Sequence, residues 1–292
     1  MTTNSFPKPL IPLTWWGIAI RSAIAVGMLL GANLLAGALL EAVVPMETLS
    51  NNQQLWAVLG LFLGVFLLVL GAVALWMKTI ERRPLSATGM TVHSKWLTGL
   101  LLSTALSVVI VVTTRLITTG LFPEAPREAI DASQFGELSW FTFTIFILGR
   151  AFFLQGIPEE LLFRGWLFQL LPQRPKITLA FTTAVFTIIH LTSNGGQQSV
   201  LDRFLYLMIP LGFGLLAGVL VLATGNFWHA VGIHGGFHIG TVLAAVVLPE
   251  TMVSVDWVII GAGYIAVAAG IGWFDSRRRQ ASAISSQARQ GV

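Results

Sequence analysis

The stretch Leu55–Met77, LWAVLGLFLGVFLLVLGAVALWM, contains no charged residue and no proline. A membrane-spanning helix needs roughly 20 consecutive apolar residues to cross ~30 Å of hydrocarbon, so this stretch predicts a transmembrane helix. The whole chain follows the same pattern, because 55% of its 292 residues are hydrophobic and only 10% are charged. A soluble domain carries about 25% charged residues. With a mean hydropathy of +0.78, the chain cannot cover itself with a polar surface, and it is predicted to be a polytopic membrane protein.

Seven further apolar stretches predict additional spans: Trp16–Leu40, Trp96–Thr114, Leu138–Ile157, Ile177–Leu191, Phe204–Ala223, Phe227–Leu248 and Trp257–Phe274. The expected fold class is therefore all-α, a polytopic transmembrane helical bundle of about eight spans. The first apolar run is longer than the 7–15 residues of a signal-peptide core, so it is counted as a retained span.

The chain divides into three parts, with no internal repeat and no water-soluble domain. Residues 1–137 hold the first three spans, residues 138–248 hold the membrane core with its polar residues, and residues 249–292 hold the last span and a basic tail. The last ~18 residues are rich in Ser, Gln and Arg, a composition that predicts disorder.

The loop charges predict the orientation. One set of alternate loops carries basic residues, namely Lys8, then Lys78, Arg82, Arg83 and Lys95, then Arg174 and Lys176, then Arg277–Arg279. The other set is mainly acidic and carries Glu41, Glu47, Glu124, Glu128, Asp131, Glu137, Glu250 and Asp256. Because basic loops stay in the cytoplasm, both termini are expected to be cytoplasmic.

The charge and cysteine content restrict the chemistry. The chain has no cysteine, which excludes disulfides, thiol catalysis and Cys-ligated zinc. Its net charge is +4, and the basic residues lie between apolar stretches, where binding to the lipid bilayer explains them better than a nucleic-acid interface.

Ionisable residues inside apolar stretches mark the candidate site, because such residues are costly in a membrane and usually functional. In the segment Gly156-Ile-Pro-Glu-Glu-Leu-Leu-Phe-Arg-Gly165, Pro158 is expected to kink the helix or start a new one, which would put Glu159 and Glu160 in a first turn near the cytoplasmic end of the fourth span. Glu160 and Arg164 are four residues apart with the acid first, so they are predicted to pair. Glu159 faces elsewhere and stays free for chemistry. The alternative is that both glutamates only cap a helix.

Histidines favour the chemical interpretation. His190 ends the fifth stretch, and His234 and His238 share one face of the seventh helix, with Gly235 and Gly236 between them allowing close approach. His229 lies off that face and is assigned an interfacial role.

Three motifs in this order resemble the CPBP family, the CAAX-protease and bacteriocin-processing (Abi-like) intramembrane peptidases. They are Glu159-Glu160-x-x-x-Arg164, Phe186-x-x-x-His190 and His234-x-x-x-His238, and the resemblance extends over about residues 140–245. The family usually has Asn or Asp where this chain has His238.

The resemblance implies a glutamate-dependent intramembrane endopeptidase, a multi-pass protein of a bacterial plasma membrane acting on a membrane-associated peptide or protein. Glu159 and His190 would activate a water, while His234 and His238 would stabilise the oxyanion. Glu160 and Arg164 would support the site. No cofactor is required.

Three alternatives stay open. Bound zinc would use Glu159, His190, His234 and His238, although the chain has no His-Glu-x-x-His motif. A proton-coupled transporter would also place Glu and His in the membrane, but the sequence has no repeat. A non-catalytic scaffold or immunity protein would keep the fold alone.

For the peptidase, the four catalytic side chains are expected to converge on a cavity in the inner half of the bilayer that opens to the cytoplasm, with Glu159 and His190 within ~10 Å of each other.

Overall fold

The computed structural model describes residues 6–125, 127–128, 139–248, 250–251 and 254–290. Its α-helices are α1 (Trp15–Val43), α2 (Asn51–Trp76), α3 (Trp96–Leu121), α4 (Trp140–Leu148), α5 (Ile157–Glu160), α6 (Pro175–Ile189), α7 (Val200–Tyr206), α8 (Met208–Thr224), α9 (Trp228–Val247) and α10 (Val255–Gln290). Wider π-helical turns cover Met77–Glu81, Gly149–Gly156 and Leu161–Trp166, and short 3₁₀ turns cover Met46–Thr48, Leu85–Thr88, Leu167–Gln169 and His190–Thr192.

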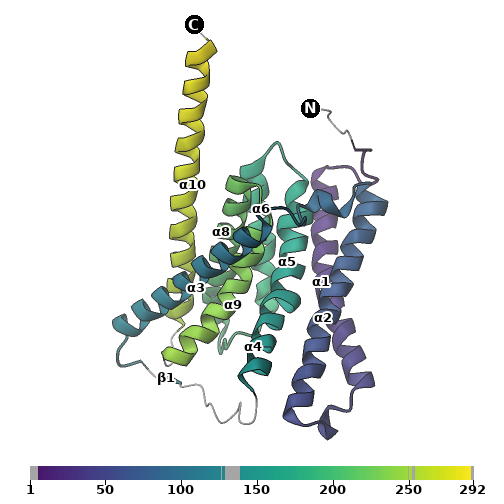
Figure 1. Ribbon diagram of the computed structural model, residues 1–292, viewed down its shortest axis with the longest axis vertical. Coiled ribbons are helices and arrows are strands. Elements are labelled where there is room, and N and C mark those ends of the chain that lie inside the picture. The colour runs from purple at the N-terminus through teal and green to yellow at the C-terminus, as the bar shows by residue number, and fades with distance from the viewer. Residues whose placement is uncertain (1–5, 126, 129–138, 249, 252–253, 291–292) are drawn as a thin grey trace.

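The described residues form eight helices long and apolar enough to cross a membrane, which confirms the predicted all-α bundle. Several of these spans join consecutive elements, for example Trp140–Gln169, which runs from α4 through α5. α1 begins and α10 ends at the same end of the bundle (Figure 1), as an even number of crossings requires. At the opposite end, the two-residue strands β1 (Arg127–Glu128) and β2 (Glu250–Thr251) pair antiparallel and tie two connections together.

Glycines fix the packing of α9 against α3. Gly232, Gly236 and Gly240 are four residues apart and therefore share one face of α9. A Cβ atom at Gly232 would lie 2.4 Å from the carbonyl oxygen of Leu100, and one at Gly236 would lie 2.6 Å from that of Thr104. Only glycine permits this approach, the usual way in which membrane helices pack closely. The tight contact fixes how α9 is rotated about its own axis, and hence where its histidines point.

The fourth span is longer than the sequence indicated. It was expected to end at Ile157, but it continues to Gln169, so the glutamate pair lies inside the span and not at its cytoplasmic end. Leu138, its predicted start, lies outside the described residues.

The predicted break at Pro158 is also wrong in one respect. The proline takes the second position of α5, but Gly156 before it keeps helical angles (φ −56°, ψ −53°), and the chain stays helical throughout. The π-helical turns at Gly149–Gly156 change the backbone hydrogen-bonding pattern just before the proline, and such π-bulges are frequent at functional sites. Without a free helix N-terminus, the expected dipole contribution at the two glutamates is absent.

Two assignments at the end of α3 need correction. The third span was expected to stop at Thr114, but α3 reaches Leu121 and so contains Arg115. Asp256 was expected in an outer loop, yet it is buried in the first turn of α10, where its carboxylate lies 2.9 Å from Arg115. Among the other acids of that predicted loop set, Asp131 and Glu137 lie outside the described residues.

The predicted disorder of the tail is wrong as well. α10 continues as helix to Gln290 and projects beyond the bundle (Figure 1). Arg279 lies 2.7 Å from Asp275 and donates to the carbonyl of Leu222 at 3.0 Å, so its side chain bonds back to α10 and to α8.

A buried ion pair joins the first two spans to the fourth. Arg21 of α1 contacts Glu81 at 2.7 Å, and both side chains are almost fully buried. The indole N–H groups of Trp76 and Trp166 also donate to Glu81, at 2.9 and 3.1 Å. Glu81 therefore anchors α1, α2 and the turn that follows Arg164. The charge of Arg21 inside an otherwise apolar stretch was the sequence signal for this contact.

Candidate functional site

Glu160 connects two spans at the centre of the molecule. Its Oε1 lies 3.3 Å from Nη1 of Arg164, which confirms the predicted pair. The same oxygen lies 3.0 Å from Nδ1 of His234 on α9. All three side chains are buried. Because buried charges are stable only when paired, this triad holds the fourth span and α9 in fixed relative positions.

Glu159 lies on a different face of the helix and approaches His190. Its Oε2 is buried without a hydrogen-bond partner and lies 3.9 Å from Nε2 of His190. This agrees with the expected separation of less than ~10 Å.

The hydrogen bond of His190 fixes its tautomer. Its Nδ1 lies 2.7 Å from the carbonyl oxygen of Phe186, which can only accept, so Nδ1 carries the proton. In the neutral ring Nε2 is then an acceptor. A water molecule could donate one hydrogen to this nitrogen and the other to Glu159 at ordinary distances of about 2.8 Å.

The two histidines of α9 lie side by side. The rings of His234 and His238 are 5.4 Å apart, and Nε2 of His238 is buried with no hydrogen-bond partner. Nδ1 of His234 is already bonded to Glu160, so Nε2 is the nitrogen left for another group. This contact with Glu160 was not expected from the sequence, which assigned His234 to the oxyanion alone.

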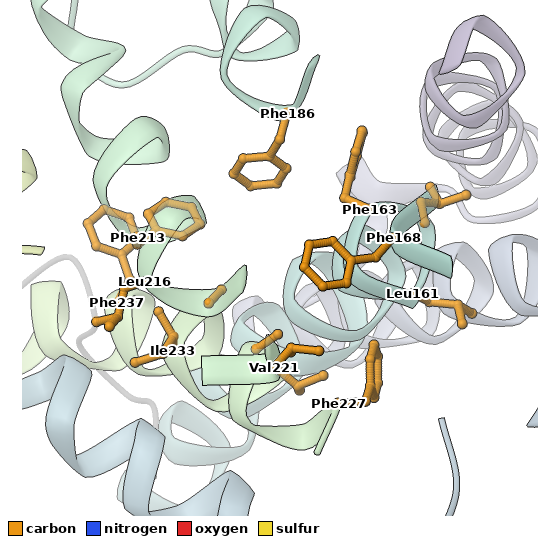
Figure 2. Close-up of a cluster of buried hydrophobic side chains, with 14 of the residues drawn as sticks. Leu161, Phe163, Phe168, Phe186, Phe213, Leu216, Val221, Phe227, Ile233 and Phe237 are labelled. Atoms are coloured by element: carbon orange, nitrogen blue, oxygen red, sulfur yellow. The ribbon is translucent and has the colours of Figure 1, made fainter. Parts of the chain in front are cut away.

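Aromatic rings contact the cluster, and Figure 2 shows two of them, Phe186 and Phe213, among the buried hydrophobic side chains. The rings of Phe186 and His190 are 4.7 Å apart. The Arg164 guanidinium lies over the face of the Phe186 ring, 4.2 Å from its centre. Phe213 packs against His234 at 4.8 Å. These rings limit access of water to the charged groups, which strengthens their electrostatic interactions.

Gly214 makes space for this arrangement. A Cβ atom there would lie 2.5 Å from Nη2 of Arg164 and 3.1 Å from the Phe186 ring. The sequence signal was only a glycine in an apolar stretch, which does not by itself indicate what the glycine faces.

A cavity of about 400 Å³ adjoins the cluster. Its walls include His190, His234 and His238, together with Arg150 and residues from the loop after α6 and the first turn of α10. Three of the site residues predicted from the sequence (His190, His234 and His238) therefore line one cavity. Glu159 does not line it, but its Oε2 lies 3.9 Å from Nε2 of His190, which does.

The direction of the cavity differs from the prediction. It was expected to open at the end where the termini lie. Instead, Ser193–Gly195 and Asp256 line it. Ser193–Gly195 follow α6, Asp256 lies in the first turn of α10, and both lie at the opposite end of the bundle. The reason is again the longer fourth span, whose last turns and aromatic residues fill the end nearest the termini.

The cluster contains several buried polar atoms without a hydrogen-bond partner, and two of their residues, Gln155 and His238, line the cavity. These atoms are Oε1 of Gln155, Oε2 of Glu159, Oε2 of Glu160, Nε and Nη2 of Arg164, and Nε2 of His238. A buried polar atom without a partner is costly, and such atoms in one place are typical of a site that binds a ligand or water. Gln155 and Arg150 were not singled out from the sequence.

Within the described ranges, no group of three or more His, Asp or Glu residues is placed so that it could hold a metal ion.

Fold and composition define an integral multi-pass membrane protein with a buried Glu–His–Arg cluster between its spans. Residues 140–240 match the family model described as type II CAAX prenyl endopeptidase Rce1-like, a family of membrane-embedded proteases. This match confirms the family resemblance predicted from the motifs, and all six site residues lie within it. No curated protein and no solved structure matches the chain.

Proposed function

We propose that this protein is an intramembrane endopeptidase that hydrolyses a peptide bond of a membrane-associated peptide or protein. One observation carries the proposal: the buried, unpartnered carboxylate oxygen of Glu159 lies 3.9 Å from the acceptor nitrogen of His190, beside a cavity inside the bundle. The match of residues 140–240 to a CAAX endopeptidase family supports a peptide substrate.

The proposed reaction begins with a water bonded to Glu159 and His190. Glu159 accepts one proton from this water while the water oxygen forms a bond to the peptide carbonyl carbon. The carbonyl π electrons move to the oxygen, which becomes an oxyanion. When the C–N bond breaks, the proton held by Glu159 passes to the leaving nitrogen, so atoms and charges balance.

His234 and His238 are proposed to donate hydrogen bonds to the oxyanion. For His234 this requires an N–H at Nε2 while Nδ1 stays bonded to Glu160. The condition is met when Glu160 and His234 together hold two protons. Either Glu160 carries one and Nε2 of His234 the other, or both nitrogens of His234 are protonated. In the second case the Glu160 carboxylate lies between two positive charges, those of Arg164 and His234. Glu160 thus acts through His234 and is a positioning residue.

The reaction as drawn uses no metal, and zinc bound by Glu159 and the three histidines is the alternative. Elemental analysis of the purified protein distinguishes them, together with activity measured after chelation. The metal-free reaction predicts full activity after chelation and no stoichiometric zinc. Zinc at one per chain, with activity lost to the chelator, would overturn it.

Comparison of membrane proteomes tests the function itself. Cells expressing the wild type are compared with cells expressing Glu159→Gln, and Glu47→Gln is the matched control because Glu47 is exposed in the 3₁₀ turn Met46–Thr48. We expect a truncated membrane protein in the wild type and the control that stays intact with Glu159→Gln. The same cleavage in all three, at equal expression, would instead favour a scaffold role.

A further inference from the structure

A second cavity, of about 560 Å³, lies at the end of α2, far in sequence from the proposed catalytic residues. It is a hollow that is open at the surface, with Pro7 on one side, Ala74 and Lys78 on another, and the turn Arg82–Leu85 beside them. The N–H of Leu10 donates to the carbonyl of Ile80 at 2.8 Å, which holds the N-terminal segment against this turn. The cavity is therefore built by packed chain on both sides.

The cavity has positive charge that no acid neutralises. Lys78, Arg82 and Arg83 line it, and within the part of the chain that the structure describes none of them forms an ion pair. Nε of Arg83 is buried without a hydrogen-bond partner. The nearest acid in sequence, Glu81, points inward and is already bonded to Arg21 and two tryptophans.

The backbone separates this acid from its basic neighbours. The π-helical turn Met77–Glu81 ends at Arg82, which has φ 57° and ψ 39°. Among the described residues it is the one non-glycine residue with a positive φ, a conformation that costs roughly 1–2 kcal/mol. Such strain persists where the surrounding structure enforces it, often at functional sites. Here the positive φ of Arg82 lies where the chain turns, so that Glu81 points into the protein while Arg82 and Arg83 line the cavity.

The position of the cavity identifies the ligand chemistry. Lys78 and Glu81 lie in the last turn of a membrane span, at the end where α1 begins with the exposed Trp15. Tryptophan is enriched at the level of lipid headgroups. The remaining walls, Pro7, Ala74 and Leu85, are apolar and suit the glycerol and upper acyl region of a lipid. We propose that this cavity binds the phosphate headgroup of an anionic phospholipid, with Lys78, Arg82 and Arg83 as its cationic contacts.

Lipid binding to the purified full-length protein in detergent tests the proposal. Native mass spectrometry is recorded with equimolar phosphatidylglycerol and phosphatidylcholine, and then with added inorganic phosphate. We expect phosphatidylglycerol to bind in preference to phosphatidylcholine, and inorganic phosphate at millimolar concentration not to displace it. Arg83→Gln and Lys78→Gln should each weaken phosphatidylglycerol binding about fivefold.

Arg278→Gln is the control, since Arg278 is an exposed basic residue outside the cavity. Its lipid binding should equal that of the wild type. Lys78 is exposed, so its substitution keeps the fold even if that of Arg83 does not. Equal weakening by Arg278→Gln and Lys78→Gln would overturn the proposal in favour of diffuse attraction by basic loops. Displacement by inorganic phosphate would overturn it in favour of a free-anion site.

Discussion

Glu159 and Glu160 are adjacent in the chain but have opposite surroundings. Glu160 contacts Arg164 at 3.3 Å and His234 at 3.0 Å, whereas Glu159 has a buried oxygen with no partner. Neighbouring residues on a helix point about 100° apart, so one can join a polar network while the other faces a reaction site. This difference separates a supporting role from the proposed chemical one.

Stability should distinguish the two glutamates. Glu160→Gln removes the charge that balances the fully buried Arg164, and breaking a buried ion pair costs about 3–5 kcal/mol. Glu159→Gln removes no hydrogen bond that the described residues form, and this variant should unfold at the wild-type temperature. Thermal unfolding of the two purified variants measures this. Equal destabilisation by both changes would contradict the division of roles.

Gly214→Ala tests the space around Arg164. The new methyl carbon would lie 2.5 Å from the buried guanidinium and 3.1 Å from the Phe186 ring, so the Arg164 side chain would have to shift. We expect destabilisation of about 1–3 kcal/mol and reduced cleavage. Gly31→Ala is the control, since a Cβ at Gly31 meets nothing within 4 Å. Wild-type unfolding and cleavage in Gly214→Ala would show that the site tolerates displacement of Arg164.

At the scale of elements, the α3–α9 contact sets the register of the histidines. Gly236 approaches the carbonyl oxygen of Thr104 so closely that a Cβ would be 2.6 Å from it. The backbone oxygen cannot rotate away as a side chain can. The two helices would therefore have to separate, and His234 and His238 would move with α9.

Gly236→Ala should consequently lower the unfolding temperature, by an amount equivalent to about 1–3 kcal/mol. Where no steric conflict exists, alanine stabilises a helix relative to glycine by up to about 1 kcal/mol. A control at an open glycine position should therefore be as stable as the wild type or more stable. Gly270→Ala in α10 meets nothing within 4 Å and should not lower the unfolding temperature. Similar shifts in both variants would contradict the packing role of Gly236.

The sequence predicted the spans well because hydrophobicity and helix length are local properties. The Glu160–Arg164 pair was also predictable, since a four-residue spacing fixes proximity on one helix. The end of the fourth span was not, because Leu161–Gln169 contains one arginine whose charge is matched inside the protein. The Glu160–His234 bond, the Arg21–Glu81 pair and the direction of the cavity depend on how spans pack together, and spacing along the chain does not encode that.

For the whole molecule, orientation follows from the loop charges and the even number of spans. The basic loops lie at the end where α1 begins, whereas Ser193–Gly195 and Asp256, at the other end, line the cavity. If the termini are cytoplasmic, as the positive-inside rule predicts, the proposed substrate would reach the cavity from the outer face of the membrane.

Because the chain has no cysteine, single cysteines report this topology without background. Asn194→Cys lies at the cavity and Gln173→Cys at the opposite end, and both positions are exposed. We expect a membrane-impermeant maleimide to label Asn194→Cys from outside intact cells, and Gln173→Cys only after lysis. Tags at residues 1 and 292 should both report cytoplasm. Labelling of both cysteines from one face would refute the arrangement of spans.

The central claim is that Glu159 activates a water that attacks a peptide bond. Membranes from cells lacking the protein are incubated in H₂¹⁸O with purified wild type, Glu159→Gln or Glu47→Gln, and new protein C-termini are analysed by mass spectrometry. We expect a new C-terminal carboxylate carrying one ¹⁸O atom with the wild type and with Glu47→Gln. Glu159→Gln should yield at least 100-fold less of it, as expected for loss of a general base, roughly 10²–10⁴-fold. An ¹⁸O-labelled product formed equally by folded Glu159→Gln, or no product from any of the three, would contradict the claim.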